Sequence, residues 1–321
     1  MVTIKDVAKL ANVSVGTTSR ALQGVGYVSK ESKEKVYNAA KELGYIVNLG
    51  AKKLKSNSSK KTIGIIISDF GNDYFYKVMS VLHEQLQALN IDFIITFSAR
   101  HPEDEIKQFK YLISNRVSTI LFIPSTDTNK DILDLADKNK INVIQLFVRV
   151  YKDYTAIVND DEQGCFLATE RLIKLKCKRI ILIDVDYSNY NTIIEPSRSE
   201  GFIKCLNNHP NVKHLILSHD PLSPFNNEII NQIEKFNPDG IITGTGLTGL
   251  KVLKYLKNSS KKIKFVSFDD NEWFDYHGVT TIKQNTKELA KMICDSIINN
   301  NANLPNDIYQ IVGESIIIRE E

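Results

Sequence analysis

Short apolar runs alternate with amphipathic helical patterns from Thr62 onward, and this alternation restricts the fold more than any other feature of the sequence. The apolar runs read TIGIIIS, DFIITFS, TILFIP, NVIQLF, RIILIDV, HLILS, GIIT and KFVSF. Uninterrupted apolar strands separated by helices are typical of parallel sheets that are covered on both faces. The sequence therefore predicts an α/β body, and its length of roughly 260 residues suits two doubly wound parallel-sheet subdomains better than one.

The first 44 residues contain three short helical patterns and predict a small all-α module. Thr3 and Asp6 form a T-x-x-D capping box before the first pattern, and Ser14 and Ser29 are suitable N-cap residues for the second and third. The tight turn between the first two patterns predicts a helix-turn-helix DNA-binding domain. A purely structural three-helix bundle is the alternative, but it leaves the polar face of the second helix unexplained.

In a helix-turn-helix the second helix enters the major groove, so its first residues meet the base edges. Val15 is suited to contact with a thymine methyl group, Arg20 to guanine or phosphate, and Thr17 and Ser19 to phosphate oxygens. Gly16 offers no side chain to a base and costs about 1 kcal/mol inside a helix relative to alanine.

Positive charge is concentrated at the N-terminal end of the chain. Residues 1–61 hold twelve Lys or Arg and four Asp or Glu, whereas the remainder has an excess of acidic residues. This distribution favours a polyanionic partner for the N-terminal module. The basic segment 48–55 is too short to be a stable helix alone in water, so we expect it to become ordered on DNA. Gly50 leaves a flexible linker as the alternative.

The stretch TIKDVAKLANVSVGTTSRALQGVGYVSKESKEKVYNAAKELGY resembles the DNA-binding domain of the lactose-repressor (LacI/GalR) family, and weaker similarity extends to the C-terminus. The T-V-S-R signature of that family appears as Thr17-Thr18-Ser19-Arg20, while Gly16 stands where Ala, Thr or Gln is usual. The resemblance implies a hinge helix in which Leu54, with Ala51 three residues before it, wedges between base steps in the minor groove. The predicted DNA-binding residues are Thr3, Ser14, Val15, Gly16, Thr17, Ser19, Arg20, Ser29, Ala51 and Leu54.

The same resemblance implies a body like a periplasmic sugar-binding protein, in which two similar lobes enclose a ligand. It divides the chain into a helix-turn-helix domain at 1–46, a hinge helix and linker at 47–61, and an effector-binding and dimerisation domain at 62–321. Within the last domain, one subdomain is expected at about 62–159 and 285–312, and the other at about 160–284 and 313–321.

Ligands of doubly wound sheets bind at the carboxyl ends of the strands, so polar and aromatic residues there are candidates for effector binding. The predicted effector-binding residues are Asp69, Asn72, Phe75, Phe147, Asp160, Arg198, Thr245, Asp269 and Trp273. By resemblance, Arg198 and Asp269 are the principal contacts, and Asp160 matches the aspartate of the family's D-N-x-x-G. The alternatives are a salt bridge between the lobes for Arg198 and helix capping for the aspartates. The segment 147–149 reads F-V-R where the family usually has I-D-R, so an aromatic contact is expected in place of a polar one.

A glycine-rich motif, GTGLTG at residues 244–249, suggests a different function. It lies between an apolar strand and an amphipathic helix, with Asp269 twenty residues past the last glycine, as in dinucleotide-binding folds. An NAD-dependent oxidoreductase is therefore an alternative. However, at least five strand and helix units precede the motif, and no catalytic acid, base or metal constellation accompanies it. We therefore expect no enzyme activity and no cofactor, and the motif becomes one wall of an effector cleft.

The predicted function is that of a ligand-controlled transcription regulator, in the first instance a repressor. Its expected partners are an inverted-repeat operator in double-stranded DNA, a second copy of the chain in a homodimer, and a sugar or sugar acid. The segment EWFDYHGVTTIKQ resembles a family branch that responds to sugar acids. Apolar faces on helix 74–89 and segment 286–300 are expected at the dimer contact, and the lack of leucine heptads after Gln310 argues against a tetramer. A sugar-binding protein without DNA activity is a further alternative.

Several classes of protein are disfavoured by simple patterns. No apolar run approaches the roughly 20 residues of a membrane span, and the N-terminus lacks a signal-peptide core. The four cysteines are far apart, and no histidine stands beside them at metal-ligand spacing. We therefore expect a bacterial cytoplasmic protein that is associated with the nucleoid through DNA binding, with no metal site and no membrane partner.

Overall fold

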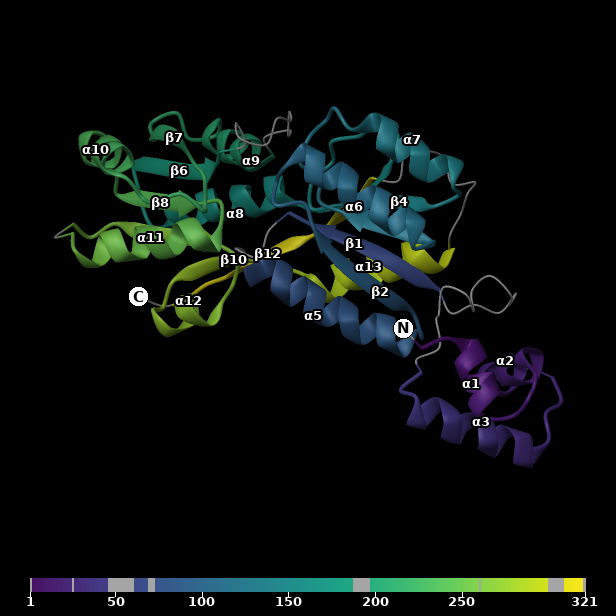
Figure 1. Ribbon diagram of the computed structural model, residues 1–321. Helices are drawn as coiled ribbons and strands as arrows, with labels where there is room; N and C mark the ends of the chain where they lie inside the picture. Colours follow the sequence, from purple (N-terminus) through teal and green to yellow (C-terminus); the bar gives the residue numbers. More distant parts are fainter. Residues whose placement is uncertain are drawn as a thin grey trace. The chain divides into compact units, whose positions relative to one another are not determined.

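The computed structural model describes residues 2–24, 26–45, 61–68, 73–186, 197–259, 261–299 and 309–319, and the chain divides into two compact units, 1–60 and 61–321 (Figure 1). Four of the predicted site residues, Ala51 and Leu54 in the hinge and Asp69 and Asn72 after the first strand, lie outside the described residues.

The N-terminal unit is the predicted set of three helices, α1 (Ile4–Leu10), α2 (Val15–Gln23) and α3 (Lys30–Glu42). The first backbone N–H groups of a helix lack partners within it, and capping side chains satisfy some of them. Here the Ser14 hydroxyl accepts a hydrogen bond from the Thr17 amide at 3.0 Å, and Ser29 caps α3 in the same way. The Thr3 amide donates to Asp6 Oδ2 at 2.8 Å before α1. The helix-turn-helix fold is confirmed.

Small side chains let these three helices pack closely around one core. Tyr37 of α3 donates a hydrogen bond through its hydroxyl to the Ala21 carbonyl of α2 at 3.1 Å. The buried core residues are Val7, Ala11, Ala21, Val36, Ala39 and Ala40.

The second unit contains two six-stranded sheets, each covered by helices, which we call the N lobe and the C lobe. The N-lobe strands, in sheet order, are β11 (Tyr309–Val312), β5 (Thr155–Asn159), β4 (Asn142–Leu146), β3 (Thr119–Phe122), β1 (Thr62–Ile67) and β2 (Asp92–Phe97). The C-lobe strands, in sheet order, are β12 (Glu314–Ile317), β10 (Thr280–Gln284), β9 (Lys264–Phe268), β8 (Gly240–Thr243), β6 (Arg179–Val185) and β7 (Lys213–His219).

Helices cover both faces of each sheet, which explains why the central strands are apolar throughout. The N-lobe helices are α5 (Asp73–Ala88), α6 (Pro102–Ser114), α7 (Lys130–Lys138) and α13 (Thr286–Asn299). The C-lobe helices are α8 (Asp161–Lys174), α9 (Ser197–Leu206), α10 (Asn227–Phe236), α11 (Gly246–Lys257) and α12 (Glu272–Tyr276). In the N lobe, α5 and α13 share one core with the sheet, and α6 and α7 share the other. The predicted pair of doubly wound sheets is confirmed.

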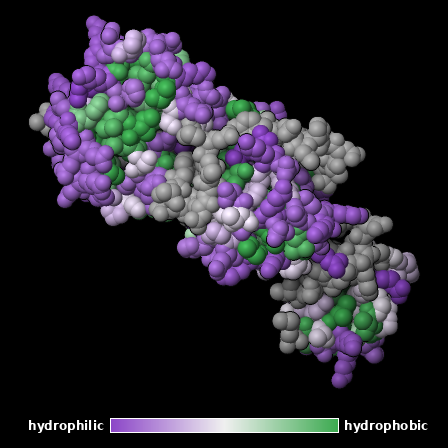
Figure 2. All heavy atoms as spheres, turned by 90° about the horizontal axis from the view of Figure 1, so that it is seen from above, coloured by the Kyte–Doolittle hydropathy of each residue, from purple (hydrophilic) through white to green (hydrophobic). Residues whose placement is uncertain are grey.

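One detail of this body was not predicted, and one expectation needs correction. All pairs among the described strands are parallel except β10 with β12, which is antiparallel because the chain enters the C lobe from β11, at the carboxyl ends of the other strands. The apolar faces of α5 and α13, which we expected at a dimer contact, pack against each other inside the N-lobe core; Val78 and Ile293 are both fully buried there. Hydrophilic residues cover most of the surface in Figure 2, and hydrophobic residues gather in a few patches.

The chain passes between the lobes three times, and each passage is short. It passes from β5 to α8 after Asn159, from β10 to α13 after Gln284, and from β11 to β12 at Gly313. These three crossovers place the carboxyl ends of β5 and β10 between the lobes, where ligands of doubly wound sheets bind.

Candidate functional site

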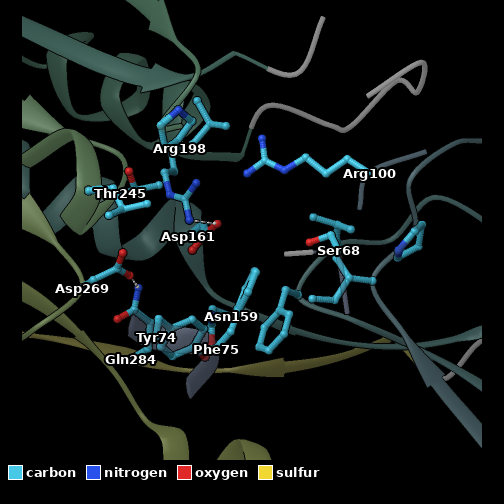
Figure 3. Close-up of a pocket in the computed structure, with 17 residues that line it drawn as sticks. Ser68, Tyr74, Phe75, Arg100, Asn159, Asp161, Arg198, Thr245, Asp269 and Gln284 are labelled. Atoms are coloured by element: carbon cyan, nitrogen blue, oxygen red, sulfur yellow. Dashed lines mark hydrogen bonds and ion pairs between the residues drawn. The ribbon is translucent and has the colours of Figure 1, made fainter. Parts of the chain in front are cut away.

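A cavity lies between the two lobes at the carboxyl ends of their strands (Figure 3). The N-lobe residues that line it are Ser68, Tyr74, Phe75, Arg100, Ile123, Pro124, Phe147, Val148 and Asn159. The C-lobe residues that line it are Asp161, Val185, Arg198, Pro221, Thr245, Leu247, Asp269 and Gln284. The two walls differ in character, because the charged residues of this described lining, other than Arg100, come from the C lobe.

Five of the predicted effector-binding residues line this cavity: Phe75, Phe147, Arg198, Thr245 and Asp269. They come from α5, from the segment after β4, from α9, from the N-cap of α11 and from the end of β9. The sequence separates the first and last of them by almost 200 residues, and the fold brings them to one site.

Two of the predicted residues are not in the lining. Asp160 is the N-cap of α8, where its Oδ1 accepts a hydrogen bond from the Gln163 amide at 3.0 Å, and the neighbouring Asp161 faces the cavity instead. Trp273 lies on α12 with 61% of its surface exposed. Helix capping, the alternative role, therefore describes Asp160, and the short helix after β9 turns Trp273 away from the cavity.

The C-lobe wall is built around a buried ion pair. Arg198 Nη2 lies 2.8 Å from Asp161 Oδ2, and the Arg198 guanidinium lies over the Phe268 ring, 4.8 Å from its centroid. The pair joins α8 to α9 within the C lobe, so the expected alternative of a salt bridge between the lobes does not describe it. Burial raises the pKa of Asp161, and the charge of Arg198 opposes this shift.

Asp269 is fixed by two donors. Its Oδ2 accepts a hydrogen bond from the Gly246 amide at 2.7 Å. Its Oδ1 accepts one from Gln284 Nε2 at 2.9 Å, which Figure 3 shows. Burial raises the pKa of Asp269, while the bond from Gly246 and the charge of Arg198 lower it. The carboxylate is thus held rigidly at the junction of β9, β10 and α11.

The N-lobe wall is largely aromatic and aliphatic. The rings of Phe75 and Phe147 are stacked with centroids 4.7 Å apart and an interplanar angle of 22°, and Tyr74 packs on Phe147 at 5.4 Å with its ring tilted by 66°. The Tyr74 hydroxyl donates to Asn159 Oδ1 at 2.9 Å, which fixes the ring. Phe147 has a φ of 68°, an unusual conformation for this residue type, and the turn it makes keeps its ring against the cavity.

Two polar contacts join the lobes. Arg100 of the N lobe and Asp220 of the C lobe form an ion pair of 3.2 Å, with each side chain only 19% exposed. The Asp220 carboxylate is held in turn by the Leu222 amide at 3.1 Å and the Ser223 hydroxyl at 2.8 Å. On α5, the Lys77 ammonium donates to the carbonyl of Asp270 in the C lobe.

Several lining residues were not among the predicted ones, although the sequence carried a signal for them. Asn159 and Gln284 are the last residues of β5 and β10, and Arg100 follows β2 after a turn in which Ala99 and Arg100 have positive φ. The rule that ligands bind at the carboxyl ends of strands applies to all three.

The GTGLTG motif does not form a cradle for pyrophosphate. A dinucleotide fold leaves the helix N-terminus free for phosphate, but here the Gly246 amide already binds Asp269. Thr245 caps the same helix by accepting from the Thr248 amide at 3.3 Å. A Cβ on Gly249 would lie 2.3 Å from Ser267 Oγ, so close packing of α11 on the sheet accounts for this glycine.

In the helix-turn-helix, α2 presents one side outward and buries the other. Val15 is 43% exposed, and Gly16 and Arg20 are also exposed, whereas Thr18 is buried and donates to the Ser14 carbonyl at 3.0 Å. The predicted residues Thr17 and Ser19 are partly exposed, and Thr3 and Ser29 are exposed at the starts of α1 and α3. The nearest atom to a Cβ added at Gly16 would be 3.7 Å away, so packing within the unit does not require glycine there.

Comparison with known proteins identifies the family. The family described as bacterial regulatory proteins, lacI family, matches residues 3–48. The family described as periplasmic binding proteins and sugar binding domain of LacI family matches residues 60–290, which is more than half of the chain. The chain belongs to the LacI family. This LacI-family protein is therefore a DNA-binding transcriptional regulator. The two alternative predictions, an NAD-dependent oxidoreductase and a sugar-binding protein without DNA activity, are wrong.

Individual relatives resemble the regulator along its whole length. The sucrose operon repressor of Lactococcus lactis subsp. lactis is 30% identical, and the match covers 93% of each protein. The HTH-type transcriptional regulator MalR of Streptococcus pneumoniae serotype 4 is 26% identical over 98% of this chain and 99% of that protein. The lac repressor bound to ONPG in its repressed state superposes with a TM-score of 0.79 at 22% identity, over 99% of this chain and 98% of that one, which supports the fold.

Membrane spans and metal sites are absent from the part of the regulator that the structure describes. No helix there is long and apolar enough to cross a membrane. No group of three or more His, Cys, Asp or Glu side chains in the same ranges is arranged to hold a metal ion. All four cysteines are buried as free thiols.

Proposed function

We propose that this regulator is a repressor that binds an inverted-repeat operator as a homodimer and responds to an uncharged sugar in the cavity between its lobes. The observation that carries the proposal is that a polar wall faces an aromatic wall across the cavity. Arg198, Asp161 and Asp269 offer fixed donors and acceptors on one side, and Phe75 and Phe147 offer an apolar face on the other. A sugar ring has hydroxyl groups at its edge and C–H groups on its faces, so it matches both walls.

An uncharged sugar fits the charges of the cavity better than a sugar acid does. Arg198 is paired with Asp161, and Arg100 is paired with Asp220, so both guanidinium groups already face a carboxylate. Asp269 adds a further acid to the wall. An anionic ligand would have to break an ion pair or lie beside an uncompensated carboxylate, and both cost free energy in a partly buried site.

The segment that resembles a sugar-acid branch contributes no charged residue to the described lining, so it does not oppose an uncharged ligand. It spans residues 272–284, and Gln284 is its single residue in the described lining. Gln284 binds Asp269 and is itself uncharged. Three relatives are sucrose operon repressors, from Lactococcus lactis subsp. lactis, Pediococcus pentosaceus and Streptococcus mutans serotype c, so sucrose is the first ligand to test.

Coupling between sugar and DNA would follow from the three crossovers. A ligand that binds both walls favours the closed arrangement of the lobes, and closure changes the direction in which the chain leaves the N lobe toward residues 47–61. A hinge helix with Leu54 in the minor groove would then align or separate. Coupling free energies between two such sites are typically about 1–3 kcal/mol.

The test begins with operator selection. Purified full-length protein is used to enrich fragments of the host chromosome, and the bound fragments are sequenced; failure to enrich any inverted repeat would contradict the proposal. Sucrose, maltose, cellobiose, glucose and gluconate are then titrated against the protein–operator complex. We expect an uncharged sugar to change operator affinity by roughly 5–150-fold. A response to gluconate alone would contradict the uncharged class.

Two substitutions assign the roles of the sites. Arg198→Ala should abolish the response to the sugar while operator binding persists, and Arg116→Ala, an exposed arginine outside the lining, is the matched control. Leu54→Ala should weaken operator binding more than binding to random DNA, because a wedge between base steps acts only at the specific site. Equal losses on both DNAs would remove the wedge role. Sedimentation analysis of the free protein and of the operator complex tests the homodimer.

A further inference from the structure

Glu314 has a buried carboxyl group that the proposed function does not use. It is the first residue of β12, directly after the crossover at Gly313, and the sheet register pairs it with Gln284 of β10. It therefore stands beside a residue of the cavity wall, at the point where one crossover leaves the C lobe and another enters it.

The packing of α8 leaves room for the Glu314 carboxyl group. A Cβ on Gly164 would lie 1.7 Å from Glu314 Oε2, so any larger residue at that position would push the carboxyl away. Gly164 comes one turn after Asp161, the first residue of α8. The same turn of helix thus supplies the acid of the cavity wall and the gap that Glu314 fills.

Three buried oxygens of these two acids have no donor among the described residues. They are Glu314 Oε1, Glu314 Oε2 and Asp161 Oδ1, whereas Asp161 Oδ2 is bound to Arg198. Buried polar atoms nearly always have a hydrogen-bond partner, and exceptions need a physical reason. A single proton between the two carboxyl groups accounts for two of the three oxygens, because one oxygen of Glu314 can then donate a hydrogen bond to Asp161 Oδ1.

The charges that surround Glu314 favour this proton. Asp161 on α8 and Asp269 after β9 face it, Asp184 on β6 adds negative charge beside Asp161, and Arg198 on α9 is the cation of the cluster. Burial, and then the charge of Asp161, raise the pKa of Glu314 well above its usual value, and Arg198 opposes this only in part. Two acids that share one site behave in this way because both cannot be ionised at low cost.

We propose that Glu314 is a positioning residue of the effector cavity, which keeps a proton and donates a hydrogen bond through it to Asp161, so that Asp161 in turn holds Arg198 in place. The inference rests on the proposed function in so far as Arg198 binds the sugar. When the proton leaves, two carboxylates compete for one guanidinium and repel each other. Arg198 is then drawn away from the cavity, and the affinity for sugar falls as the pH rises.

The proton is tested first without any ligand. The infrared C=O stretch of a protonated carboxyl group is recorded for the full-length protein at about pH 7 and compared with that of Glu314→Gln. We expect a buried carboxylic-acid band in the wild-type protein that the variant lacks. Glu170→Gln is the matched control, because Glu170 lies on α8 with its side chain 40% exposed in a pair with Lys174. The proposal would be overturned if Glu314→Gln kept the carboxylic-acid band of the wild type at pH 7. It would also be overturned if Glu170→Gln lost that band to the same extent.

The second arm measures sugar affinity against pH, with sucrose or the sugar of the panel above that binds. For the wild type and Glu170→Gln we expect the affinity for sugar to fall at least threefold between about pH 6 and about pH 9. For Glu314→Gln we expect less than half of that fall, because an amide donates a hydrogen bond at every pH. Equal pH profiles in all three proteins would overturn the positioning role. If no sugar binds, the proposed function fails, while the infrared arm still decides whether Glu314 holds the proton.

Discussion

The ion pair between Arg100 and Asp220 should set how firmly the lobes close over a sugar. It joins the two lobes beside the cavity, and each of its side chains is 19% exposed. At the observed 3.2 Å, the Coulomb energy of the pair is about 1 kcal/mol in bulk water and about 5 kcal/mol at an effective dielectric constant of 20. Loss of hydration offsets part of the larger value. We therefore expect a net coupling of about 1–2 kcal/mol, which is roughly a 5- to 30-fold change in sugar affinity.

A double-mutant cycle measures this coupling. Arg100→Met, Asp220→Asn and the double variant are titrated with the responsive sugar in a calorimeter, and the coupling is the difference between the double effect and the sum of the single effects. The same cycle on Lys130 and Asp153, an exposed pair within the N lobe at 2.7 Å, is the control and should leave the affinity unchanged. A coupling below about 0.3 kcal/mol, or tighter binding by either single variant, would refute the reasoning.

Three further predictions concern stability. Gly249→Ala should lower the free energy of unfolding by about 1–3 kcal/mol in urea, because the new Cβ would lie 2.3 Å from Ser267 Oγ and 2.6 Å from Phe274 Cζ; an unchanged midpoint would show that α11 shifts freely. Gly16→Ala should raise the melting temperature of the N-terminal unit, since alanine gains about 1 kcal/mol in an open helix position, and a lower value would reveal a contact not accounted for. Burial raises the pKa of Glu105 above 4.5, so the folded protein favours the protonated acid. The free energy of unfolding of the wild type, relative to that of Glu105→Gln, should therefore fall as the pH rises from 4.5 through the raised pKa. A constant difference between the two proteins in urea titrations across this range would contradict the shift.

The sequence predicted the parts of the fold that depend on periodicity. Apolar runs between amphipathic helices determine a parallel sheet with two covered faces, and both sheets follow this pattern. The direction of β12 was not predictable in the same way, because four residues carry no signal for the end of the C-lobe sheet at which the chain enters. Amphipathic faces have a related limit: α5 and α13 are apolar on one side, but the pattern does not say whether a core or another subunit covers it.

The candidate site shows where single-residue predictions fail. Asp160 is the N-cap residue and Asp161 the first residue of α8, so the two adjacent side chains point in different directions and only Asp161 lines the cavity. The backbone decides which, because Asp160 is engaged by the Gln163 amide. Glu314 was not singled out, although an acid beside an apolar strand is itself a signal that the carboxyl group has a buried role.

The contact between Asp269 and the Gly246 amide means that this regulator carries its own substitute for a phosphate. A helix N-terminus that begins with glycine attracts anions, and in this chain the anion is part of the protein. Replacement of Asp269 by a small neutral residue would expose that helix end to the cavity. The step from a site for neutral sugars to one for phosphorylated sugars could thus begin with the loss of one carboxylate, without any new cationic side chain.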